Sequence, residues 1–111
     1  MAREVTDEPG IDSYDFTRVL AAVADPIRLS IVRQLAEADG ALTCGAIELP
    51  IKASTATHHF TALRQAGVLH QYYVGTSRMN LLRTDDLERV YPGFLPSVVA
   101  GASKTQTRSR P

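Results

Sequence analysis

A run of short polar side chains between residues 52 and 65 is the part of this sequence best suited to contact another molecule. It carries hydroxyls, an imidazole, an amide and a lysine, on Lys52, Ser54, Thr55, Thr57, His58, Thr61 and Gln65. On a helical wheel, Ala56, Phe60 and Leu63 fall on one side and most of the polar residues on the other. Such a polar side can hydrogen-bond to base edges and phosphates, and a helix N-terminus offers further N–H groups. An ordinary amphipathic helix has the same pattern, so the choice between a binding helix and an ordinary one depends on the surrounding elements.

Two helices are predicted ahead of this segment. Apolar residues recur at helical spacing over 14–24, and Asp25-Pro26 is a helix-start signal, with Asp as N-cap and Pro in the first turn. The second helix is expected to end at Asp39-Gly40. Its wide apolar arc indicates a central position in the fold.

The polar segment itself is expected on the second of two closely spaced helices. A short helix is predicted over about 43–49 and is stopped by Pro50. Ser54 is a suitable N-cap for the next helix, which Gly67 would end. Two helices joined in this way form a helix-turn-helix.

The periodicity then changes to that of strands. Residues 68–82 are rich in Val, Leu and Tyr and carry Gly75-Thr76 in the middle, which predicts a two-stranded hairpin with Arg78 just beyond its turn. A short helix capped by Thr84 and a last apolar helix from Phe94 are expected to follow. The predicted fold is mostly α with one small β-hairpin, a winged helix-turn-helix in the order α-α-α-α-β-β-α.

Charge is unevenly distributed along a chain whose net charge is zero. Residues 1–12 are acidic and predict a flexible arm, residues 13–100 form the folded domain, and residues 101–111 predict a disordered basic tail. The segment 51–83 holds Lys52, Arg64, Arg78 and Arg83 without any acid, which is a basic footprint typical of nucleic-acid binding. A solvated surface face would explain the same charges. The start lacks the apolar stretch of a signal peptide and no apolar run would span a membrane, so we expect a cytoplasmic protein.

Three motifs in the same order resemble the ArsR/SmtB family of bacterial repressors. They are LAAVADPIRLSIVRQL, LTCGAIELPIKASTATHHFTALRQAGVL and YYVGTSRMNLLR, and together they lie within residues 16–83. The resemblance implies a homodimer on a double-stranded DNA operator, repression of its own or an adjacent operon, and release by an effector that the sequence does not identify. It places DNA contacts on the polar residues of segment 52–65 and on Gly75, Thr76 and Arg78 of the wing.

The resemblance also implies dimerisation through the first and last helices. The residues concerned are Phe16, Val19, Leu20, Val23, Phe94, Leu95, Val98 and Val99. Two recognition helices would then lie about one DNA turn apart, roughly 34 Å.

Cys44 is the single cysteine, so an internal disulfide is excluded. We expect no metal and no cofactor, because one thiol supplies too few ligands and the last helix lacks the Asp and His of the other metal site known in the family. A redox switch at Cys44 and a small packing residue are both open readings. His59, at the edge of the apolar side, is interpreted as a packing residue.

Two other functions compete with DNA binding as interpretations of this sequence. A winged helix used only for protein contact would show no salt-sensitive DNA binding. An enzyme with Cys44 as nucleophile and His58 or His59 as base is disfavoured, because no Asp or Asn is placed to orient the base and no Gly-rich phosphate loop is present.

Overall fold

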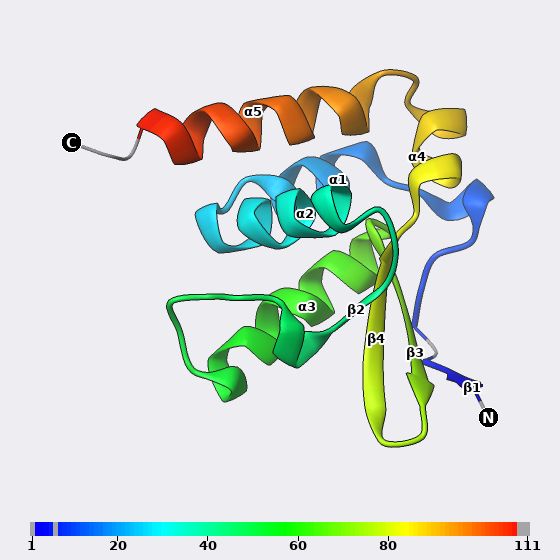
Figure 1. The fold of residues 1–111 in the computed structure, drawn as a ribbon. Coiled ribbons are helices and arrows are strands. Elements are labelled where there is room, and N and C mark those ends of the chain that lie inside the picture. Colours follow the sequence, from blue (N-terminus) through cyan, green and yellow to red (C-terminus); the bar gives the residue numbers. More distant parts are fainter. Residues whose placement is uncertain (1, 6, 109–111) are drawn as a thin grey trace.

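The computed structural model describes residues 2–5 and 7–108, arranged as a helical layer beside a small antiparallel sheet (Figure 1). In chain order the elements are β1 (Ala2–Glu4), η1 (Ile11–Ser13), α1 (Phe16–Val23), α2 (Pro26–Ala38), β2 (Leu42–Thr43), η2 (Cys44–Ala46), α3 (Ala53–Ala66), β3 (Leu69–Val74), β4 (Ser77–Leu82), α4 (Thr84–Val90) and α5 (Phe94–Arg108). The predicted mostly helical chain with a hairpin after its polar helix is confirmed. The architecture is that of a winged helix-turn-helix.

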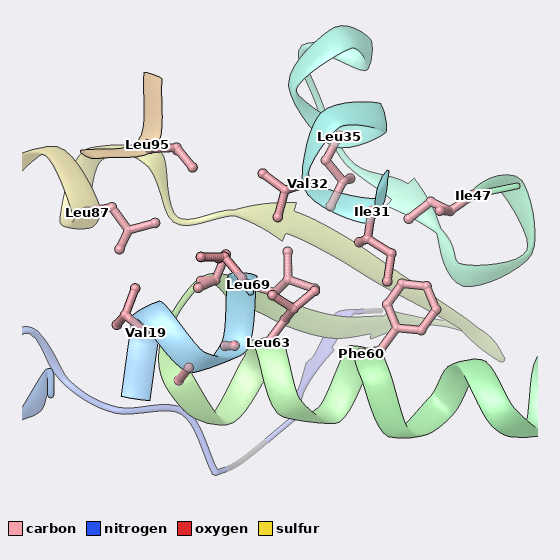
Figure 2. Close-up of a cluster of buried hydrophobic side chains, with 14 of the residues drawn as sticks. Val19, Ile31, Val32, Leu35, Ile47, Phe60, Leu63, Leu69, Leu87 and Leu95 are labelled. Carbon is pink, nitrogen blue, oxygen red and sulfur yellow. The ribbon is translucent and has the colours of Figure 1, made fainter. Parts of the chain in front are cut away.

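The core lies between α2, α3 and the sheet (Figure 2). Ile31, Val32 and Leu35 of α2 are buried, and they meet Phe60 and Leu63 of α3. The wide apolar arc of α2 is explained by this central place, because α1, α3 and α5 all pack against it. Full burial of each large aliphatic side chain contributes about 1.5–3 kcal/mol.

Of the three helix caps predicted from the sequence, one is confirmed and two are wrong. Asp25 caps α2, and its carboxylate accepts from the N–H groups of Ile27 and Arg28 at 2.8 and 3.1 Å. Ser54 is not the N-cap of α3, because the helix begins at Ala53 and the residue before it is Lys52. Thr84 is likewise the first residue of α4 and not its cap. In neither helix does the capping position make a side-chain hydrogen bond.

The sheet has four strands in the order β1-β3-β4-β2. The hairpin of β3 and β4 turns at Gly75-Thr76, where Gly75 has φ +62°, and pairs Tyr73 with Arg78. The sequence reasoning predicted this hairpin but neither outer strand. The helix predicted over 43–49 is corrected, since Leu42–Thr43 pairs with β4 and only a single 3₁₀ turn, η2, follows.

The expectation of a flexible arm over residues 1–12 is also corrected. Ala2–Glu4 pairs with β3, where it covers backbone groups that would otherwise form an open edge. η1 and the segment before it then lead into α1. At the other end, α5 continues to Arg108 through the region 101–108 predicted as a disordered tail, with Ala102 buried. Residues 1, 6 and 109–111 lie outside the described part of the chain.

Gly67 ends α3, and the N-terminal segment packs against it. Its φ of +92° is the left-handed conformation that favours glycine, and its N–H is bonded to the carbonyl of Arg64. The Tyr14 hydroxyl donates to the carbonyl of Gly67 at 2.7 Å, and burial raises the pKa of Tyr14 to about 12. A Cβ on Gly67 would collide with the Tyr14 ring.

We predict that Gly67→Ala lowers the free energy of unfolding by about 2 kcal/mol, because backbone strain adds to the collision with Tyr14. Urea unfolding followed by circular dichroism measures this. Gly45→Ala is the matched control, since a Cβ there meets open space at an ordinary φ. Equal stability of the two variants would contradict the role given to Gly67.

We predict that Asp25→Ala costs about 1 kcal/mol at pH 7 through loss of the N-cap. Burial alone would raise the pKa of Asp25, but the N–H groups of Arg28 and Ile27 outweigh it and hold the pKa below 3.8. The capping contribution is therefore full above the unfolded pKa and is lost as pH falls through the lower folded pKa. The stability difference between wild type and variant should shrink below about pH 4. A stability difference that stays constant from pH 7 down to pH 2 would contradict this assignment.

Candidate nucleic-acid interface

The N-terminal half of α3 presents an exposed polar surface. Lys52, Ser54, Thr55, Thr57 and His58 are all exposed. The opposite face is buried in the core, as the sequence pattern predicted. The predicted polar side of the helix therefore faces outward.

Further along α3, the side chains predicted to contact DNA are less accessible. Thr61 is half-buried, and Gln65 donates to the carboxylate of Asp7 at 2.6 Å. That hydrogen bond, with Arg64 nearby, holds the pKa of Asp7 below its usual value. The Thr57 hydroxyl donates to the carbonyl of Ala53 at 3.2 Å, which leaves the hydroxyl oxygen able to accept. The exposed surface is thus concentrated in the first two turns.

The wing brings one cation next to this surface. Gly75 and Thr76 at the turn are exposed. The Arg78 guanidinium lies 4.9 Å from the centroid of the Tyr73 ring and is hydrogen-bonded to the Tyr73 hydroxyl. Arg78 also lines a cavity of about 160 Å³ together with Ala53 and Thr57. Tyr73 therefore holds Arg78 beside the N-terminal end of α3.

Sequence reasoning missed a buried polar chain that joins α3 to the wing. Arg64 is 8% exposed and donates to Gln71 of β3 at 2.8 Å, and Gln71 donates to Asn80 of β4 at 2.6 Å. The Asp7 carboxylate lies 3.5 Å from the Arg64 guanidinium. The sequence carried a signal for this, because Arg64 follows Phe60 by four residues and so falls on the apolar face.

The basic footprint of residues 51–83 is weaker than the sequence suggested. Arg64 is buried and paired, and Arg83 binds Asp86 at 2.9 Å and the carbonyl of Pro9 at 2.7 Å. Of the four cations in that segment, Lys52 is exposed, and Arg78 is half-buried beside Tyr73. His70 in turn lies 3.0 Å from Glu8.

The side chains proposed for redox and packing roles, Cys44 and His59, have separate partners. Cys44 is half-buried, and its Sγ accepts from the Asn80 amide at 3.2 Å. His59 is half-buried, and its Nδ1 lies 3.8 Å from the Asp25 carboxylate. Within residues 5 and 7–104, no group of three or more His, Cys, Asp or Glu side chains is placed to hold a metal ion.

The residues predicted for dimerisation divide into three groups by burial. Val19, Val23 and Leu95 are buried in the core of the chain itself, so they are not free to meet a second copy. Phe16 and Leu20 are 43% and 42% exposed. Phe94, Val98 and Val99 are half-buried against the core. The ring of Phe16 lies tilted against that of Tyr91, with centroids 4.5 Å apart, and edge-on to that of Phe94, with centroids 5.5 Å apart.

Comparison with known proteins gives two matches. Residues 23–72, from the end of α1 to the middle of β3, match the helix-turn-helix domain family. The chain is 31% identical over 83 residues to an uncharacterised helix-turn-helix-type transcriptional regulator, YceK, of Bacillus subtilis (strain 168); the match covers 73% of this chain and 83% of that protein. No helix in the described part of the chain is both long and apolar enough to cross a bilayer. The chain belongs to the family of helix-turn-helix transcriptional regulators.

Proposed function

We propose that this protein is a cytoplasmic, dimeric repressor of the ArsR/SmtB type that binds a double-stranded DNA operator and is released by an effector. The single observation that carries the proposal is the joint placement of the α3 N-terminus and Arg78 around one small cavity. In a winged helix-turn-helix, this pairs a polar helix for the major groove with a cation for the flanking backbone. The protein acts by binding and not by catalysis.

The two parts of the surface supply different kinds of contact. His58 and the exposed hydroxyls of α3 carry donors and acceptors but no permanent charge, which suits them to base edges. Lys52 and Arg78 supply positive charge, which suits them to phosphate or the minor groove. Because few cations on this surface are free to meet phosphates, base contacts would account for an unusually large share of the affinity for DNA.

We predict that His58→Ala costs roughly 1–3 kcal/mol on the operator and little on random DNA, because base contacts carry discrimination. Arg78→Ala should weaken both duplexes and lower the salt slope by about one unit per subunit. Fluorescence anisotropy at several salt concentrations measures both, with a footprinted duplex from upstream of the gene and a random duplex of equal length. Arg89→Ala, an exposed arginine on α4, is the matched control.

The same measurement decides between the competing functions. If His58→Ala weakens both duplexes equally and Arg78→Ala affects only the operator, the division of roles between helix and wing is wrong. A folded wild-type protein with no salt-sensitive DNA binding would favour the second candidate, a winged helix that contacts proteins only.

Dimerisation is proposed through α1 and α5, now carried chiefly by Phe16 and Leu20. Phe16 packs in an aromatic cluster with Tyr91 and Phe94, and Leu20 follows it by one helical turn and is equally exposed. A two-fold interface would apply the same patch twice and cover it on both copies. Placing two α3 helices about one DNA turn apart, roughly 34 Å, depends on this contact.

We predict that Leu20→Glu raises the dimer dissociation constant at least roughly tenfold, since about 1.5 kcal/mol of apolar burial is lost and a charge is introduced. Sedimentation equilibrium measures the constant, and circular dichroism confirms the fold. Val74→Glu is the control, because Val74 is equally exposed but lies on the wing. A wild-type monomer at micromolar concentration would refute the dimer.

A further inference from the structure

A groove of about 690 Å³ lies where the C-terminal end of α2, the base of wing strand β4, α4 and the start of α5 meet. Its volume falls within the roughly 300–1,000 Å³ typical of small-molecule sites. None of the described residues that line it belongs to α3. A ligand in this groove would therefore leave the polar surface of α3 free.

The walls of the groove are apolar. Leu35 and Leu95 are buried, with 2% and 4% of their surface exposed, and Val99 and Leu81 line the groove with them. Leu81 is 37% exposed, although it belongs to the base of a packed strand. An aromatic or aliphatic body would cover these side chains and remove their surface from water.

The rim of the groove is acidic. Asp39, Asp85 and Glu88 line it and are all exposed, and none of the described lining residues is Lys, Arg or His. Glu88 already accepts a hydrogen bond from the N–H of Gly93 at 3.1 Å, which fixes its carboxylate near the start of α5. Three carboxylates around an apolar floor produce a negative potential that favours a cation.

We propose that this groove binds a hydrophobic organic cation, a molecule with an aromatic or aliphatic body and one permanent or protonated positive centre. Apolar floor and acidic rim match the two parts of such a molecule. A second copy of the chain is a poorer occupant, because its exposed apolar residues Phe16 and Leu20 would desolvate the three carboxylates without neutralising them.

The groove also fits the role of an effector site, a step that rests on the proposed function. Its walls come from the wing strand β4 and from α5, one element proposed to contact DNA and one proposed to contact the second copy. A ligand that touches both biases their relative position, and so couples its own binding to that of DNA.

Direct binding is tested first, on the full chain, with two ions of nearly equal shape and opposite charge. Isothermal titration calorimetry should show saturable binding of tetraphenylphosphonium, one per chain, and at least roughly tenfold weaker binding of tetraphenylborate. Higher salt should weaken the phosphonium binding. Equal affinity for both ions, or no binding of the phosphonium, would overturn the proposal.

The double variant Asp39→Asn/Asp85→Asn tests the rim. Asp39 has φ +54°, a conformation that Asn tolerates equally well, so the fold is preserved. Phosphonium affinity should fall roughly fivefold, while Asp12→Asn, an exposed acid away from the groove, should leave it unchanged. Unchanged phosphonium affinity together with an altered oligomeric state would identify the groove as an interface between copies and overturn the proposal.

The effector role is tested by repeating the anisotropy titrations with saturating tetraphenylphosphonium. Operator affinity should fall several-fold in wild type and much less in the double variant. Selective binding of the phosphonium without any DNA binding would support the site and refute the proposed function. Intact operator binding with no response to bound phosphonium would overturn the effector role.

Discussion

The guanidinium of Arg64 is the constraint on which the rest of this structure depends. A charge removed from water must be paired and hydrogen-bonded, and loss of a partner from a buried pair typically costs about 3–5 kcal/mol. Gln71 on β3 and Asp7 on the N-terminal segment supply those partners, and Gln71 is bonded onward to Asn80 on β4. The polar helix α3, both wing strands and the start of the chain are thereby fixed relative to one another.

This constraint shapes the proposed recognition surface. Because the wing is bonded to α3 from within, Arg78 is held beside the α3 N-terminus rather than carried on a free hairpin. Tyr73 adds a second restraint through its ring and its hydroxyl. A surface arranged in advance in this way loses less conformational entropy on binding. The same pairing uses up cations that would otherwise attract any DNA, so the free charge on this face is small.

The N-terminal segment is the least expected part of the fold, and it joins the same network. Its backbone pairs with β3, Glu8 accepts from the N–H of Gln71 at 2.8 Å, and Pro9 accepts from Arg83. In the sequence, the acidic residues of this segment predict a flexible arm. In the structure Asp7 pairs with Arg64, and Glu8 contacts His70 and the N–H of Gln71, so the acidic start is joined to the basic middle of the chain.

The sequence alone determined α1, α2, α3 and the hairpin, because each of these depends on local chemistry: apolar spacing for the helices, the Asp25 cap of α2, and the positive φ of Gly67 and Gly75. It also determined which side of α3 faces outward. Only the tertiary structure decided which arginines remain free, that Ala2–Glu4 becomes an edge strand, and that Val19 and Leu95 serve the core while Phe16 and Leu20 stay exposed. Those outcomes depend on partners distant in the chain, such as Asp7 for Arg64 and β3 for β1, and a local pattern carries no record of such partners.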